Sequence, residues 1–122
     1  MPNKNCILVV DDNNSLRRVL SKELSENGYV VLTAANGREA INLVEDEKID
    51  LVLLDIKMPE LDGFEVLKYI KRKFPLVKVI MLTAYADLKN AMKSKKLGAD
   101  DFASKPFDLA DLFSTIDRVL QT

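Results

Sequence analysis

Residues 50–55 read Asp50-Leu51-Val52-Leu53-Leu54-Asp55, an unbroken aliphatic run between two aspartates. A short apolar run without polar alternation is typical of a strand that is covered on both faces of its sheet. Such strands belong to parallel sheets, in which crossover helices cover both faces. This stretch therefore predicts a buried strand of a parallel α/β sheet, with Asp55 at its carboxyl end.

Four further apolar runs flank this stretch along the chain: Cys6–Val10, Tyr29–Leu32, Val77–Leu82 and the weaker Asp101–Ser104. The run at residues 29–32 is the candidate for an edge strand. Segments with apolar residues at helical spacing follow each run, over about residues 14–27, from 36, from 63 to Pro75, 87–96 and from 108. Gly28 and Gly98 are typical residues to end a helix, and Asp108 is a typical N-cap.

Five strands that alternate with five helices predict a (βα)5 chain, because parallel strands need helical crossovers. An eight-fold barrel would need about twice this length. We expect a doubly wound, flavodoxin-like sheet with strand order 2-1-3-4-5. In such sheets ligands bind at the carboxyl ends of the strands, near the switch point between strands one and three.

The composition fits one domain over residues 1–122, with 48% hydrophobic and 30% charged residues. A net charge of −1 gives no general attraction to nucleic acid or to an anionic membrane. No segment approaches the roughly 18 apolar residues of a membrane span, and the start of the chain lacks the apolar region of a signal peptide. The single Cys6 cannot form an internal disulfide, which suits the cytoplasm.

The chain has no histidine, which excludes Ser-His-Asp and Cys-His catalysis as usually built. One cysteine and no histidine also make a zinc site improbable. A metal site in this protein would therefore hold a hard cation through carboxylates, with Mg2+ or Mn2+ as the candidates.

Polar residues follow four of the five predicted strands: Asp11-Asp12, Asp55, Thr83-Ala84 and Lys105-Pro106. The three carboxylates would repel one another, and without a counter-charge at least one would become protonated. A divalent cation and Lys105 would balance them, which suits phosphoryl transfer. Taken singly, each residue has an ordinary structural explanation: an aspartate forms turns or caps a helix, and a lysine is solvated. Their coincidence at four strand ends favours a functional site.

In this order and spacing the motifs resemble the receiver domains of response regulators, the CheY-like family. The matching stretches cover the whole chain: Val9-Val10-Asp11-Asp12, Asp50–Asp55, Met58-Pro59, Asp62-Gly63, Leu82-Thr83-Ala84 and Lys105-Pro106-Phe107. The resemblance implies that Asp55 is the phosphoacceptor, and that Asp11, Asp12, Asp55 and the backbone carbonyl of Lys57 hold the magnesium ion.

The resemblance also implies that Thr83 donates its hydroxyl to a phosphoryl oxygen and that Lys105 pairs with another. The Lys105–Pro106 peptide bond is expected to be cis, as is usual in the family. Phe102 occupies the aromatic switch position, where it either rotates inward or stays fixed in the core. It lacks the hydroxyl that a tyrosine would offer to a partner.

Lys57 and Tyr85 lie two residues beyond Asp55 and Thr83, at positions that flank the path of hydrolytic water in this family. A long lysine and a bulky tyrosine predict a persistent phosphoryl group, as in stand-alone relay receivers of the sporulation type. The alternative is that both side chains point into solvent.

The expected donor is a phosphohistidine on a sensor histidine kinase or a histidine phosphotransfer protein, docking near Leu16 and Asn13-Asn14. The expected output surface comprises the fourth helix, the fifth strand and the fifth helix. It would act on a downstream protein or on an effector domain beyond this chain. The four lysines of residues 89–96 suit an acidic partner or a solvated face. We expect no separate substrate turnover, and a monomer that dimerises through the fourth helix when phosphorylated.

Three rival functions remain at this point. An aspartate-nucleophile phosphatase would place a second aspartate two residues after Asp55, where this chain has Lys57. A flavin-binding module would have a loop rich in Ser, Thr and Gly after the first strand, where this chain has Asp11-Asp12-Asn13-Asn14. The third rival is a receiver that is never phosphorylated, and the intact acidic set with Lys105 argues against it.

Overall fold

The computed structural model describes residues 5–84 and 88–122 of the chain. Five parallel strands form one sheet in the order β2-β1-β3-β4-β5, as the sequence predicts. The strands are β1 Cys6–Val10, β2 Val30–Ala34, β3 Leu51–Asp55, β4 Lys78–Ala84 and β5 Asp101–Lys105.

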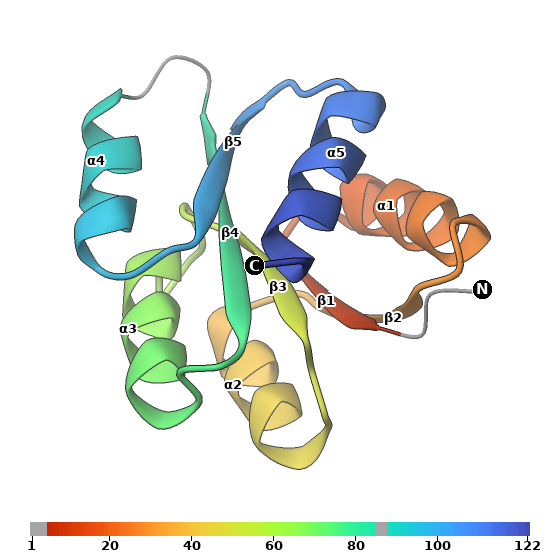
Figure 1. The fold of residues 1–122 in the computed structure, drawn as a ribbon. Helices are drawn as coiled ribbons and strands as arrows, with labels where there is room; N and C mark the ends of the chain where they lie inside the picture. The colour runs from red at the N-terminus through yellow and green to blue at the C-terminus, as the bar shows by residue number, and fades with distance from the viewer. Residues whose placement is uncertain (1–4, 85–87) are drawn as a thin grey trace.

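Five helices cover the two faces of the sheet (Figure 1). They are α1 Asn14–Glu26, α2 Gly37–Asp46, α3 Gly63–Lys73, α4 Leu88–Lys96 and α5 Leu109–Leu120. Helices α1 and α5 pack on one face, and α2, α3 and α4 lie on the other. The arrangement is the doubly wound, flavodoxin-like fold, and none of the described helices is long and apolar enough to cross a membrane.

A side chain caps the amino end of each of the helices α1, α2, α3 and α5. Asn13 caps α1 and accepts a hydrogen bond from Leu16 N, so neither Asp11 nor Asp12 is the cap. Asp11 Oδ1 instead accepts a hydrogen bond of 2.9 Å from Asn13 N. Asp108 caps α5, as predicted. Gly28 has φ 91°, and Tyr29 N donates to Leu24 O, which is the hydrogen bond of a Schellman end. The predicted start of the fourth helix at Asp87 lies outside the described residues.

Successive side chains along a strand point to opposite faces of the sheet, and an apolar core lies on each face. Ile7 and Val9 of β1 pack with Leu20 of α1 and Ile116 of α5. The intervening residues of β1 and β3 point to the opposite core, which contains Leu67 of α3. Because both faces are covered, a continuous aliphatic run such as residues 51–54 is fully buried.

β2 lies at an edge of the sheet, as predicted for the run at residues 29–32. β2 pairs with β1 alone, and Val30 is 52% exposed. The predicted strand at residues 29–32 is shifted relative to β2, because pairing with β1 runs from Cys6 opposite Val30 to Val10 opposite Ala34. The β1 partner, rather than the local apolar pattern, therefore sets where β2 begins and ends.

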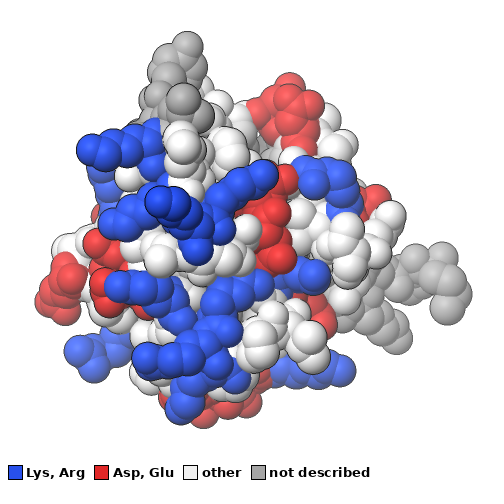
Figure 2. All heavy atoms as spheres, turned by 60° about the vertical axis from the view of Figure 1, so that its left-hand side comes forward, with Lys and Arg blue, Asp and Glu red and all other residues white. Residues whose placement is uncertain are grey.

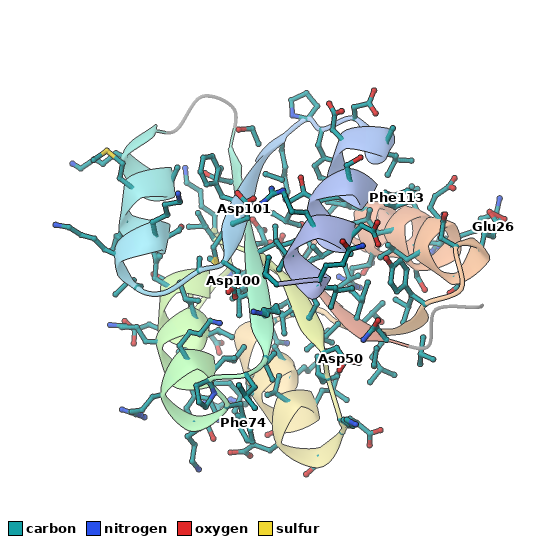
Figure 3. The ribbon with its side chains drawn as sticks, in the orientation of Figure 1. Glu26, Asp50, Phe74, Asp100, Asp101 and Phe113 are labelled. Carbon is teal, nitrogen blue, oxygen red and sulfur yellow. The ribbon has the colours of Figure 1, made fainter. Side chains whose placement is uncertain are left out.

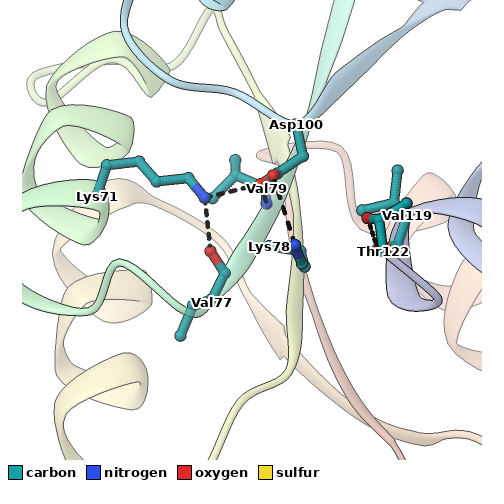
Figure 4. Close-up of polar contacts among 7 residues, drawn as sticks. All are labelled: Lys71, Val77, Lys78, Val79, Asp100, Val119 and Thr122. Carbon is teal, nitrogen blue, oxygen red and sulfur yellow. Dashed lines mark hydrogen bonds and ion pairs between the residues drawn. The ribbon is translucent and has the colours of Figure 1, made fainter.

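Two partly buried carboxylates hold the amino ends of the strands in place. Asp50, which is labelled in Figure 3, comes just before β3. Its carboxylate accepts a hydrogen bond of 2.8 Å from Cys6 N. Asp100, just before β5, accepts hydrogen bonds from Lys71 Nζ at 2.7 Å and from Val79 N at 2.8 Å (Figure 4). These contacts connect α3, β4 and β5 at the end of the sheet opposite the predicted site.

Candidate functional site at the carboxyl ends of the strands

Three carboxylates converge where β1 and β3 end. Val10 of β1 pairs with Leu54 of β3, and Asp11 and Asp55 are the residues that directly follow them. Oxygen atoms of Asp11, Asp12 and Asp55 all lie within 4.8 Å of one another. Asp11 is fully buried and Asp55 is 7% exposed, whereas Asp12 faces solvent. Carboxylate oxygens at this spacing, open to water on one side, fit a hard divalent cation such as Mg2+.

Lys105 supplies the positive charge within the cluster. Its Nζ atom donates to Asp11 Oδ2 at 2.6 Å and lies 3.4 Å from Asp55 Oδ1. Partial burial by itself lowers the pKa of Lys105, but the hydrogen bond to Asp11 and the charges of Asp55 and Asp11 outweigh it and raise this pKa. Lys105 is therefore charged at neutral pH. The Lys105–Pro106 peptide bond is cis, as expected.

The environment of Asp55 disfavours its charged form. Burial, followed by the negative charge of Asp11, raises the pKa of Asp55 from 3.8 to about 6, although Lys105 opposes the shift. The direction agrees with the repulsion expected among the carboxylates. A cation among the three aspartates would favour ionised Asp55, because it adds positive charge where negative charge is in excess.

Thr83 lies on β4, beside the strand that ends in Asp55. Leu82 is opposite Asp55 in the ladder, so Thr83 is one residue beyond it. The side chain is 2% exposed, and its Oγ1 atom has no hydrogen-bond partner among the described residues. A buried hydroxyl without a partner is unfavourable. This donor is therefore available for an acceptor that arrives at the site.

Comparison with known proteins agrees with this arrangement. The family model for the response regulator receiver domain matches residues 7–117. The chain belongs to this family. It is 46% identical over 118 residues to "Probable transcriptional regulator ycf27" of Guillardia theta, covering 97% of this chain and 46% of that protein. It is 40% identical over 114 residues to "Sporulation initiation phosphotransferase F" of Bacillus subtilis (strain 168), covering 93% and 92% of the two chains.

Among solved structures, the receiver domain resembles the chemotaxis protein CheY4 of Vibrio cholerae. The TM-score is 0.90 at 33% identity, with 96% of this chain and 99% of that chain covered. This receiver spans about half the length, or less, of the first curated relatives that it matches. Receiver domains are signalling modules of two-component systems, so the fold and the family agree on the general function.

Two of the remaining predicted site residues, Lys57 and Phe102, lie within the described part of the chain. Lys57 is exposed in the segment after β3, where it lines a groove together with Asp12. Phe102 of β5 is half-buried and packs against the core on the α2–α3 face of the sheet. Its role as a switch stays a prediction. Tyr85 lies outside the described residues.

Two contacts at the site were not predicted from the sequence. Arg17 of α1 donates from Nη1 to the backbone carbonyl of Asp11 at 2.6 Å, which holds the end of β1 against α1. The only signal was a cation about one turn into the first helix. Gly63 lies so close to β3 that a Cβ atom there would be 2.2 Å from the carbonyl oxygen of Asp55. The Asp62-Gly63 motif thus has a steric reason, since only glycine allows the loop to return beneath Asp55.

Proposed function

We propose that this receiver domain accepts a phosphoryl group on Asp55 from a phosphohistidine, in a reaction that depends on Mg2+ or Mn2+. The donor would be a sensor histidine kinase or a histidine phosphotransfer protein. The observation that carries this proposal is the cluster of Asp11, Asp12 and Asp55, with Lys105 paired to two of the three. The chain would catalyse its own modification and turn over no separate substrate.

The carboxylates of Asp11, Asp12 and Asp55, with the backbone carbonyl of Lys57, would hold the divalent cation. When bound, that cation supplies positive charge that stabilises the phosphoryl oxygens during transfer. The fit rests on the oxygen-only ligand set and on the raised pKa of Asp55, which is caused first by burial and then by the negative charge of Asp11.

In the proposed transfer, a carboxylate oxygen of Asp55 attacks phosphorus in line with the leaving nitrogen of the donor. The P–N bond breaks as the aspartyl O–P bond forms, and the electron pair returns to the imidazole ring of the donor. The absence of histidine in this chain requires the donor to be another molecule. Lys105 would pair with one phosphoryl oxygen, and the Thr83 hydroxyl would donate to another.

An apolar groove next to the site supports a docking position for the donor. It has a volume of ≈ 620 Å³ and runs between α1 and the segment after β5. Its lining includes Leu16, Val19, Pro106 and Phe107, with Lys105 at one side. A donor helix that filled this groove would bring its phosphohistidine close to Asp55, as expected for docking near Leu16.

The aspartyl phosphate would then act as a switch. The hydroxyl of Thr83, which has no partner in the described part of the chain, would move toward the phosphoryl group. The surface of α4, β5 and α5 would change with it. The output would pass to a downstream protein or to an effector domain outside this single receiver. The relatives of about twice its length support the effector domain, whereas the sporulation phosphotransferase supports a stand-alone relay. We place this exchange in the cytoplasm and expect a monomer that dimerises when phosphorylated.

The test is incubation of the purified chain with acetyl phosphate and Mg2+, followed by intact mass measurement. We expect a gain of one phosphoryl group, which is absent with EDTA and absent in Asp55→Asn. The matched control is Asp62→Asn, because Asp62 is an exposed carboxylate that caps α3 and Asn is an equally good cap. An equal gain in Asp55→Asn, or no gain in the parent chain, would contradict the proposal.

A further inference from the structure

The charges of this protein are sharply divided along the chain. Residues 66–99 contain nine of the eighteen lysine and arginine residues but one of the nineteen carboxylates. That segment therefore has a net charge of +8, whereas the rest of the chain has −9. Although the net charge of the whole chain is close to zero, this segment produces a strong local electrostatic field, which can attract an oppositely charged partner.

Figure 2 shows that lysine and arginine side chains cover much of one face of the molecule, on the side of α3 and α4. The exposed members that we call the basic face are Lys68 and Arg72 of α3 and Lys89, Lys93 and Lys96 of α4. Lys68 pairs with Glu65 at 2.9 Å. The α4 lysines form no ion pair with any carboxylate of the described residues. Their charges are therefore available to a partner.

The exposed surface of α4 also has an apolar centre. Met92 is 62% exposed and lies between Lys89, Lys93 and Lys96 at the helical spacing of one stripe. Lys93 Nζ lies 4.3 Å from the ring centroid of Phe64 on α3, so the stripe extends toward α3. An exposed methionine surrounded by cations suits a surface that is apolar at its centre and acidic at its margins.

A groove of ≈ 540 Å³ adjoins the basic face. Its apolar lining comes from Ile56, Met58, Pro59 and Phe64. Asn90 of α4 also lines it, on the side of the basic face, and its charged lining residues are Asp12, Lys57 and Asp62. Phe64 belongs to the groove and also contacts Lys93, so the two features are continuous. An apolar side chain of a partner can enter this groove while neighbouring carboxylates contact the α4 lysines.

The opposite flank of α4 has the reverse charge. Residues 100–122 contain five carboxylates and two cations. One of those cations, Arg118, forms an ion pair with Asp101, and the other, Lys105, is held in the acidic site. An acidic partner is therefore attracted to the α3 side of α4 and repelled from the β5–α5 side.

We propose that the basic face of α3 and α4 is the docking surface for an acidic amphipathic helix of a partner protein. Nucleic acid is the less suitable occupant, because Met92 and the apolar groove would face phosphates and the one aromatic ring there, Phe64, is 8% exposed. The binding is a property of the unmodified chain. It therefore goes beyond the proposed phosphorylation and does not depend on it.

The probe is a synthetic helical peptide with one stripe of leucine flanked by glutamate, and its control has glutamine at each glutamate position. Titration of the isotope-labelled, unphosphorylated chain is followed by amide NMR. We expect shifts on α3, α4 and residues 56–64, affinity that falls as salt rises, and weak binding of the glutamine peptide.

Two double variants with the same change in net charge test where the peptide binds. We expect Lys89→Glu/Lys96→Glu to weaken binding by about tenfold or more. The matched control, Lys22→Glu/Lys48→Glu, changes exposed lysines elsewhere and should bind as the parent does. Lys93 is left unchanged because it packs on Phe64. Met92→Ser should also weaken binding severalfold while the net charge stays the same.

Four results would overturn the proposal. The first is an equal loss of peptide affinity in the two double variants, and the second is amide shifts confined to β5 and α5. The third is equal affinity for the glutamine peptide and the glutamate peptide. The fourth is a DNA duplex that binds more tightly than the glutamate peptide and no longer binds Lys89→Glu/Lys96→Glu. Self-association detected by sedimentation and lost in that variant would instead assign the face to a second copy. Failure of acetyl phosphate labelling leaves this inference untouched, because the titration uses unphosphorylated protein.

Discussion

Lys105 donates a hydrogen bond of 2.6 Å to Asp11 Oδ2, across 94 positions of the chain. The contact exists because β1 and β5 both end at the same edge of the sheet, with β3 and β4 between them. It leaves Lys105 close enough to Asp55, at 3.4 Å, to serve two carboxylates at once. The charge balance of the site therefore depends on one lysine.

Lys105→Ala should reduce stability at pH 8 in EDTA by roughly 1–2 kcal/mol, since it leaves Asp11 buried beside Asp55 without a counter-charge. Urea unfolding measures the change. We expect acetyl phosphate to label the variant still, but without the amide NMR shifts on α4, β5 and α5 that phosphorylation produces in the parent. Normal shifts in the labelled variant would contradict the assigned role of Lys105.

Asp55→Asn should stabilise the metal-free chain at pH 7.5 by about 1–2 kcal/mol, after allowance for solvent screening. The pKa of Asp55 in the folded chain is raised from 3.8 to about 6. Protonated Asp55 therefore favours folding below pH 3.8, and this contribution is lost as the pH rises through about 6. Urea unfolding in EDTA should give a difference that disappears near pH 4. A difference independent of pH would show that the charge of Asp55 is not its cause.

Thr83→Val should leave the stability of the unphosphorylated chain unchanged or raise it by up to about 1 kcal/mol. The Oγ1 atom is buried without a hydrogen-bond partner among the described residues, and valine has the same shape without the polar atom. Thermal unfolding measures this effect. Ser94→Ala is a useful contrast, because Ser94 Oγ donates to Asn90 O at 2.8 Å. A loss of several kcal/mol in Thr83→Val would mean that the hydroxyl has a partner in solution.

Asp100→Ala should destabilise the fold by about 1–3 kcal/mol without changing Mg2+ affinity. The change removes the acceptor of Lys71 Nζ and Val79 N at the end of the sheet away from the site. Glu65→Ala is the matched control, since the exposed Glu65–Lys68 pair should contribute about 0.5 kcal/mol or less. Equal effects of the two changes in urea unfolding would show that the partial burial of Asp100 is unimportant.

Lys57→Ala should shorten the lifetime of the aspartyl phosphate severalfold if the exposed lysine hinders the hydrolytic water. Mass measurement over time, after removal of acetyl phosphate, gives the rate. Lys48→Ala is the control, because Lys48 is another exposed lysine and precedes the amino end of β3, whereas Asp55 is at the carboxyl end. An unchanged lifetime in Lys57→Ala would favour the alternative, in which this side chain points into solvent without a role.

The sequence predicted the fold well where the local pattern and the tertiary environment agree. The run at residues 51–54 is apolar on both faces because both faces are covered, so the unbroken apolar run alone identified β3. The pattern was weaker at β2 and β5. β2 has one neighbour, and its ends follow the pairing with β1, while all five residues of β5 are half-buried. An apolar pattern cannot locate the ends of strands that are incompletely covered.

By itself, the sequence determined which groups could do chemistry. It contains no histidine, has acidic residues at two strand ends, and has a lysine at a third. Only the tertiary structure decided that Asp11 is fully buried while Asp12 is exposed and that Lys105 serves two carboxylates. It also decided that the buried Thr83 hydroxyl has no partner within residues 5–84 and 88–122. The physical reason is that burial and charge interaction depend on distances between strands that are remote in the chain. Local sequence sets the order of the strands along the chain, but their packing sets those distances.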